Sequence, residues 1–171
     1  MMVGIDVLRV SGCDSPNDER FQQATALALR LTGRSSTRQT EISFRVIDEE
    51  EMRDLNGRFR GKDSPTNVLA FPAELTVETD LGVELLGDIA ICAPIVRREA
   101  MQQGKSVESH WDHLVIHGVL HLAGFDHDEE ESATKMEALE TIAMRELGWP
   151  DPYDPASWDS SHAAAKPGAV V

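Results

Sequence analysis

Three histidines lie within eleven residues of this 171-residue chain, at His117, His121 and His127. An α-helix turns once every ~3.6 residues, so His117 and His121 project from one helix face and can reach a single cation. Gly124 lets the backbone leave the helix through a left-handed residue, and the following turn can bring His127 to the same cation. Three imidazoles with one open position are typical of catalytic zinc, because structural zinc is usually closed by four protein ligands. We therefore predict one Zn²⁺ ion bound by these histidines.

His113 complicates this ligand set, because it forms a second i, i+4 pair with His117. On a helix, His113, His117 and His121 span only roughly 80° of the surface. Three roles stay open for His113: a ligand, a group that supports a ligand, or a packed polar residue. We favour the set without it, because only His121 lies near the glycine turn.

The histidine spacing is similar to that of zinc proteases with the pattern H-E-x-x-H-x-x-G-x-x-H. Those enzymes use the Glu after the first His as their general base. Here that position is Gly118, and Val119 and Leu120 after it are equally inert. The sequence therefore disfavours a peptide hydrolase of this type.

Candidates for substrate binding lie in the polar segment 60–67, between an expected helix and an expected strand. The planar guanidinium of Arg60 suits a phosphate group, and Lys62 is a further candidate. The alternative is a surface loop whose charges are merely solvated. Two acids are also ambiguous. Asp88 either bonds a neighbouring loop or faces the metal cleft. Asp126 either has a role at the site, where it orients a metal ligand or binds substrate, or it caps the last helix.

Hydrophobic periodicity predicts the elements that must position these residues. Strands are expected at 7–10, 41–47, 67–71 and 85–92, and helices at 17–31, 48–58, 94–103, 106–123 and 129–147. Ile42, Phe44 and Val46 should share one strand face, and Ser106 should cap the histidine-bearing helix. The order predicts an α/β (α+β) fold, in which a single mixed sheet of about four strands packs with about five helices. We expect one domain at 1–149 and a disordered tail at 150–171.

Composition limits the partners and the compartment. The formal net charge is −14, which is the wrong sign for a general grip on nucleic acid, although basic residues cluster locally. No segment reaches the ~20 apolar residues of a membrane span. We therefore expect no membrane partner. Cys13 and Cys92 are too few for a disulfide framework, so we expect a cytoplasmic protein.

Three motifs in order resemble the YbeY family of bacterial rRNA maturation factors, which are regarded as metal-dependent endoribonucleases. They are the histidine motif 117–127, the segment 60–72 (RGKDSPTNVLAFP) and the segment 86–91 (LGDIAI). The resemblance covers roughly residues 1–149. Small departures are Phe59 and Phe125 where Tyr is frequent, and Ala70 where Ser is frequent.

The resemblance implies zinc at His117, His121 and His127, and it makes Arg60 the prime candidate for a functional arginine. It also implies processing of the 3′ end of small-subunit rRNA, ribosome quality control, and partners on the small ribosomal subunit; no DNA substrate is expected. Single-stranded RNA fits better than a duplex, because its bases are accessible. The general base stays open between a zinc-bound hydroxide, Asp126, Asp88 and His113.

Two alternatives remain at this point. One is a zinc hydrolase with a non-RNA substrate such as a peptide. The other is a non-catalytic ribosome assembly factor in which zinc only braces the fold.

Overall fold

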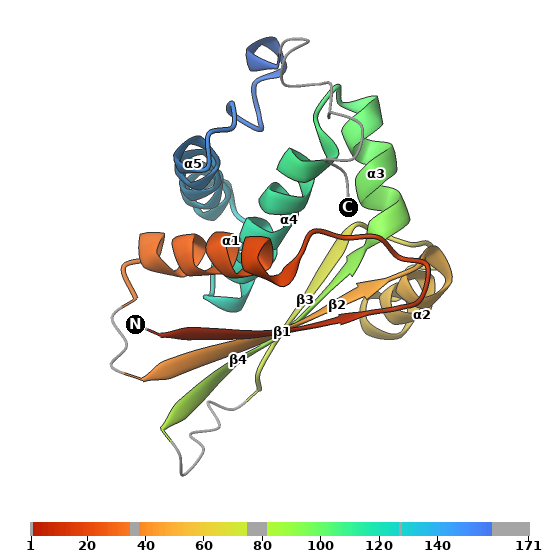
Figure 1. Ribbon diagram of the computed structural model, residues 1–171, viewed down its shortest axis with the longest axis horizontal. Coiled ribbons are helices and arrows are strands. Elements are labelled where there is room, and N and C mark those ends of the chain that lie inside the picture. Colours follow the sequence, from red (N-terminus) through yellow and green to blue (C-terminus); the bar gives the residue numbers. More distant parts are fainter. Residues whose placement is uncertain (1, 35–37, 75–81, 127, 159–171) are drawn as a thin grey trace.

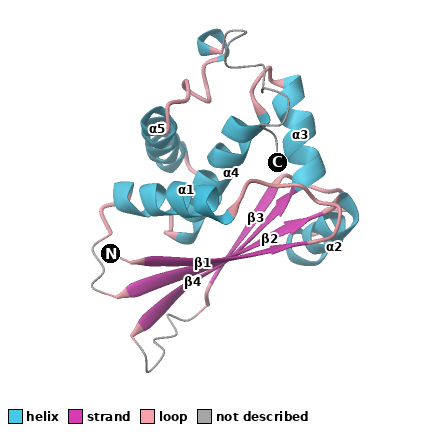
Figure 2. Cartoon of the chain, in the orientation of Figure 1, coloured by secondary structure: helices cyan, strands magenta, loops and turns pink. Residues whose placement is uncertain are grey.

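Four strands form one mixed sheet in the order β1-β2-β4-β3, as shown in Figures 1 and 2. Strands β1 (Val3–Arg9), β2 (Gln39–Ile47) and β4 (Val83–Cys92) are parallel, and β3 (Val68–Pro72) is antiparallel to β4. The computed structural model describes residues 2–34, 38–74, 82–126 and 128–158. The predicted mixed sheet of four strands is therefore confirmed.

Five α-helices accompany the sheet, as predicted: α1 (Asp18–Leu31), α2 (Glu49–Arg60), α3 (Ala93–Gln102), α4 (Val107–Leu122) and α5 (Glu130–Glu146). Helices α1 and α4 pack on one face of the sheet, and α5 packs on these two helices (Figure 1). Helix α2 packs on the other face, over its own smaller core. The histidine-bearing helix α4 is thus held between the sheet, α1, α3 and α5.

The alternation of side chains along each strand explains the two faces of the sheet. Ile42, Phe44 and Val46 of β2 enter the large core under α1 and α4, as the sequence predicts, while Ile47 enters the smaller core under α2. Along β4, Ile89 and Ile91 enter the large core, and Ala90 and Cys92 enter the smaller one. Side chains at alternate positions of the sheet therefore face α4 or face away from it.

Helix boundaries follow the capping signals in the sequence. The side chain of Ser106 accepts a hydrogen bond from Ser109 N and begins α4, as predicted. Gly124 follows its end with a φ of 100°, and its N–H donates to His121 O at 3.0 Å. The cap of α1 is Asn17, which accepts from Arg20 N.

The first strand differs from the predicted range 7–10. Strand β1 begins at Val3, because it pairs in parallel with β2 from Val3 opposite Thr40 onward. Val3, Ile5 and Val7 pack against the large core on alternate positions. The pattern of this strand is weak in the sequence because it lies at the edge of the sheet and is only partly buried.

Residues 150–158, which were expected to belong to a disordered tail, fold against the domain. They include the short 3-10 helix η1 (Pro155–Ser157), and the Nζ atom of Lys105 donates to Pro152 O at 2.6 Å. Residues 159–171 lie outside the described part of the chain. Among the helices that are described, none is long and apolar enough to cross a membrane.

Candidate metal centre and its surroundings

His117 and His121 occupy the last two turns of α4, on the same face of the helix. Their Nε2 atoms lie 3.1 Å apart, and both side chains are partly exposed. The predicted i, i+4 pairing is thus present in the structure. The third expected ligand, His127, lies outside the described residues. In the part of the chain that is described, no group of three His, Cys, Asp or Glu side chains forms a metal site.

A buried carboxylate fixes the orientation of the first histidine. Oε1 of Glu140, on α5, lies 2.5 Å from Nδ1 of His117. Burial alone would raise the pKa of Glu140, but the contacts with His113 and His117 hold this pKa below its usual range. An ionised carboxylate only accepts hydrogen bonds, so Nδ1 of His117 carries the proton. Nε2 of His117 is then the nitrogen that faces His121.

This donor set fits a zinc ion. Zinc–imidazole bonds of about 2.0–2.1 Å in a tetrahedral site place two ligand nitrogens roughly 3.3 Å apart. The separation of 3.1 Å between the Nε2 atoms of His117 and His121 is close to that value. Metal-binding histidines commonly donate their other ring N–H to a carboxylate, as His117 does to Glu140. The two histidines therefore have the spacing of zinc ligands, and His117 also has the supporting carboxylate.

His113 lies beside this pair but is turned toward the protein interior. Its Nε2 atom is 3.2 Å from Oε1 of Glu140, so it contacts the carboxylate that holds His117. Burial lowers the pKa of the His113 imidazole. The hydroxyl of Tyr153 donates to Oε2 of Glu140. Among the three roles left open by the sequence, the geometry favours His113 as a supporting group rather than a ligand.

Gly118 allows α4 to approach the sheet closely. A Cβ atom at this position would lie 3.0 and 3.1 Å from two side-chain carbons of Ile89 on β4. The position is buried and faces the core. A glutamate here, as in the zinc proteases, would enter the packed interior instead of the metal centre. The structure thus gives a packing reason for the glycine, and it agrees with the argument against a peptide hydrolase.

The Arg60 segment is fixed to α2 by its own helix end. Arg60 is the last helical residue, and Gly61 ends the helix with a φ of 68°. The backbone N–H of Lys62 donates to Asn56 O at 3.3 Å, and the amide of Asn56 donates to Ser64 O at 2.7 Å. The segment is therefore held as a defined turn rather than as an open loop.

The side chains of Arg60 and Lys62 are exposed, and no hydrogen bond or ion pair joins either of them to another described residue. The structure does not bring them into contact with His117 or His121. A cavity beside His117 is lined by Asn67, from the end of the same segment, but not by Arg60. The expected role of Arg60 at the metal centre therefore stays a prediction.

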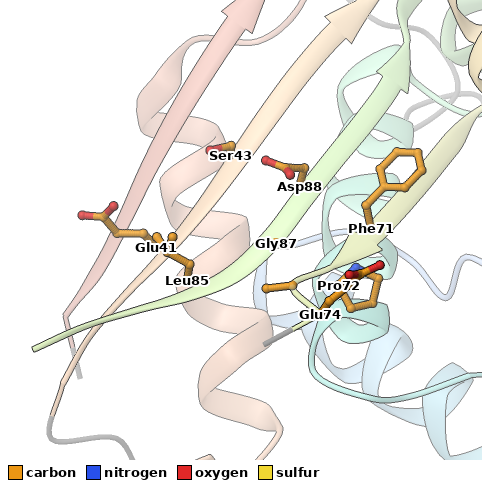
Figure 3. Close-up of a pocket in the computed structure, with 9 residues that line it drawn as sticks. Glu41, Ser43, Phe71, Pro72, Glu74, Leu85, Gly87 and Asp88 are labelled. Carbon is orange, nitrogen blue, oxygen red and sulfur yellow. The ribbon is translucent and has the colours of Figure 1, made fainter. Parts of the chain in front are cut away.

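The two ambiguous acids have different positions. Asp126 is exposed, and its Oδ1 accepts a long hydrogen bond of 3.4 Å from Asp128 N in the turn before α5. Asp88 lies opposite Ser43 of β2 on the sheet face that points away from α4, as Figure 3 shows. There it lines a surface cavity of about 460 Å³. Asp88 does not face the metal centre, so it is not the general base for chemistry at His117.

Sequence reasoning missed two residues of this site, Glu140 and Tyr153. Glu140 is fully buried and lies on the apolar stripe of α5 with Met136, Ala143 and Met144. An acid at a core position of an amphipathic helix is a signal that could have identified it. Tyr153 is the one tyrosine of the chain, but its polar, proline-rich surroundings gave no sign that it packs against the metal centre.

The chain is similar to known proteins over most of its length. The family model described as endoribonuclease YbeY matches residues 13–148. A protein named endoribonuclease YbeY from Pseudomonas entomophila is 47% identical over 159 residues, which cover 93% of this chain and 98% of that protein. Another from Pseudomonas fluorescens is 49% identical over 152 residues, which cover 89% of this chain and 97% of the relative.

A solved structure is also similar. The solution structure of TM1509 from Thermotoga maritima matches with a TM-score of 0.50 and 25% sequence identity, covering 88% of this chain and 99% of that chain. The arrangement of strands and helices described above is therefore shared with an experimentally determined protein.

Proposed function

The chain belongs to the endoribonuclease YbeY family and is an endoribonuclease; on this premise we propose that it uses one Zn²⁺ ion, held by His117, His121 and His127, to cut single-stranded rRNA. The observation that carries the zinc assignment is the His117–His121 pair, with Nε2 atoms 3.1 Å apart and Glu140 bonded to the far side of His117. The family match supports a metal-dependent reaction on RNA, and the donor set favours zinc.

A cation held by His117, His121 and His127 would supply Lewis-acid chemistry toward a phosphoryl oxygen of bound RNA. The protein's own contribution begins with Glu140, which keeps the proton of His117 on Nδ1 and leaves Nε2 available. Glu140 is fully buried and the side chain of His113 is only 12% exposed, so little water reaches this supporting pair.

Substrate contacts are assigned to the exposed cations of the Arg60 segment. The guanidinium of Arg60 binds the phosphate beside the cut bond and offsets the charge that develops on it, and Lys62 adds to this field. Asp126 lies directly before His127 and is exposed, which suits a role in orienting substrate or water near the metal. Asp88 is not included, because it faces away from α4.

The substrate is a ribosomal RNA, and the reaction belongs to maturation of the 3′ end of small-subunit rRNA and to ribosome quality control in the cytoplasm. The net charge of −14 supports a particle-bound substrate, since a strongly acidic protein has weak affinity for free RNA. Contacts with the small ribosomal subunit or one of its proteins then compensate for this weak affinity for RNA. The domain comprises residues 1–149, and residues 150–158 extend it.

Cleavage of an end-labelled single-stranded RNA by the zinc-loaded full chain tests this proposal. Internal cuts that disappear after chelation and return with added Zn²⁺ are the expected result. A folded, zinc-loaded protein that cuts neither free RNA nor small ribosomal particles would instead support the non-catalytic assembly factor.

A further inference from the structure

A cavity of about 290 Å³ lies beside His117, and its lining extends beyond the metal centre and the Arg60 segment. Its wall combines residues from β3, α3, α4 and the C-terminal segment; the polar and aromatic ones include Asn67, Glu99, Lys105, His110, His113 and Tyr153. This volume is at the lower end of the range for small-molecule sites, which is about 300–1,000 Å³. The cavity thus has room for one flat ring system rather than for a larger ligand.

The shape of the wall suits an aromatic ligand. The rings of His113 and Tyr153 meet edge to face with centroids 5.5 Å apart, and His110 and His113 do so at 6.3 Å. Apolar surface from Leu114 and Pro152 completes the lining. Imidazole and phenol rings are the surfaces on which unstacked RNA bases pack.

Glu99 carries the negative charge of this cavity, and one of its carboxylate oxygens makes only a long hydrogen bond. Oε1 lies 3.0 Å from the amide nitrogen of Asn67 and 3.2 Å from Nε2 of His110, whereas Oε2 has one contact of 3.4 Å, again with Asn67. Burial alone would raise the pKa of Glu99, but the hydrogen bonds from His110 and Asn67 hold it below its usual value. Glu99 is therefore an ionised acceptor with capacity left on Oε2.

Three further ring nitrogens on two of the lining residues are unsatisfied. Nδ1 of His110 and both ring nitrogens of His113 are buried, and none of them makes a hydrogen bond within the described part of the chain, although Nε2 of His113 lies 3.2 Å from Oε1 of Glu140. His110 is only 4% exposed, so bulk water does not replace the missing partner. Buried polar atoms without partners are uncommon in folded proteins, and a bound ligand or water near them is one explanation.

The charges of the cavity exclude a phosphate group as this ligand. Glu99 would repel an anion, and Glu140 lies behind His113. The Nζ atom of Lys105 is already engaged, since it donates to Pro152 O at 2.6 Å and lies 5.4 Å from the centroid of the Trp158 ring. A neutral heteroaromatic group that donates hydrogen bonds fits better than an anion.

We propose that this cavity takes one unpaired base of the RNA next to the cut bond, and that Glu99 selects guanine. His117 lines the cavity, so a base bound there lies beside the metal centre, and this step rests on the proposed function above. Guanine is the RNA base whose Watson–Crick edge carries two neighbouring N–H donors, at N1 and N2. Oε2 of Glu99 can accept from both of these N–H groups, while the other three bases place at least one acceptor beside any donor on that edge.

Binding of free nucleosides tests this assignment without cleavage. Guanosine, uridine, adenosine and cytidine are titrated into the full chain, and the imidazole signals of His110 and His113 are followed by NMR. We expect guanosine to shift these signals at concentrations at least ten times lower than uridine does. Glu99→Gln should remove this difference, because the amide turns one acceptor into a donor. Equal shifts by all four nucleosides, or no shift by any, would overturn the proposal whether or not the protein cuts RNA.

Cleavage provides the second readout. On an end-labelled single-stranded RNA of mixed sequence, the zinc-loaded wild-type chain should cut preferentially beside guanine, and the cuts that Glu99→Gln makes should show no preference for guanine. Cleavage without any base preference would contradict the guanine assignment but leave the endoribonuclease intact. Absence of all cleavage combined with a guanosine-specific shift would instead contradict the proposed reaction and keep the binding site.

Discussion

Nδ1 of His117 lies 2.5 Å from Oε1 of Glu140, a carboxylate that belongs to another helix and has no exposed surface. This contact determines which nitrogen of His117 carries the proton, and so which nitrogen is available to a metal ion. The metal-binding face of α4 therefore depends on α5, although the histidines themselves lie on one helix.

Replacing this carboxylate should weaken zinc binding. In Glu140→Gln, the amide can donate to His117 as well as accept, so the Nδ1–H tautomer is no longer enforced. Loss of such a supporting group typically lowers metal affinity about 10–100-fold, and we expect a decrease in this range by competition with a chromophoric chelator. Glu137→Gln, at an exposed position of the same helix, is the matched control.

Tautomer analysis of the metal-free protein separates this effect from general destabilisation. Imidazole NMR should show His117 as the Nδ1–H form in the wild type and as a mixture in Glu140→Gln. Unchanged affinity and an unchanged tautomer in the folded variant would show that Glu140 has no role in orienting His117.

Gly118 should resist even the smallest side chain. In Gly118→Ala, the new Cβ meets Ile89 at 3.0 Å in the centre of the core, and overpacking of this kind costs about 1–3 kcal/mol. We expect a lower free energy of unfolding in urea, by about 1 kcal/mol or more. Gly57→Ala is the control, because its Cβ has only an ordinary contact at 3.7 Å in an exposed part of α2. There the helix preference of alanine should add about 0.5–1 kcal/mol, and a gain in both variants would refute the packing argument.

Arg60 should act on the substrate and not on the fold. We expect Arg60→Ala to lower the rate of RNA cleavage about 10²–10³-fold, the usual loss for one charge-stabilising donor. Zinc content and thermal unfolding should stay at wild-type values, because the Arg60 side chain is exposed. Arg58→Ala removes a surface arginine paired with Asp54 on the same helix and should leave cleavage unchanged. Equal losses in both variants would indicate a general charge effect instead of a specific contact.

The ionised state of Glu99 should make stability depend on pH. Its folded-state pKa is lowered, so its stabilising contribution is fully present above the unfolded value of about 4.3 and is lost as the pH falls through the folded value. His110, His113 and Asn67 face this carboxylate. In metal-free protein, the difference in unfolding free energy between wild type and Glu99→Gln is therefore measured from about pH 5 downward, where it should be largest at the start. It should then shrink at lower pH, and a difference that grows on acidification would contradict this assignment.

Local patterns in the sequence predicted the sheet and the five helices because each element carries its own signals. The alternation of Ile42, Phe44 and Val46 identifies a strand with one buried face, and Ser106 and Gly124 mark the two ends of α4. The i, i+4 spacing of His117 and His121 fixed their common face, because helix geometry is independent of the rest of the fold.

Local patterns of this kind do not predict contacts between segments that are distant in the sequence. Glu140 contacts His117, and Tyr153 contacts Glu140, only because α5 and the C-terminal segment pack beside α4, and no local spacing encodes that packing. Asp88 illustrates the opposite case: the sequence allowed it to face the metal cleft, but its place in β4 turns it to the far side of the sheet.

The most direct test of the account measures zinc content and RNA cleavage on the same samples of wild type, His121→Ala and His110→Ala. His110 is the comparison because it lies on the same helix but outside the predicted ligand set. We expect one zinc per wild-type chain and internal cuts in single-stranded RNA. Folded His121→Ala should lose both zinc and cleavage, while His110→Ala should keep its zinc. Full zinc content or undiminished cleavage in folded His121→Ala would contradict the central claim that His117 and His121 hold the metal on which the reaction depends.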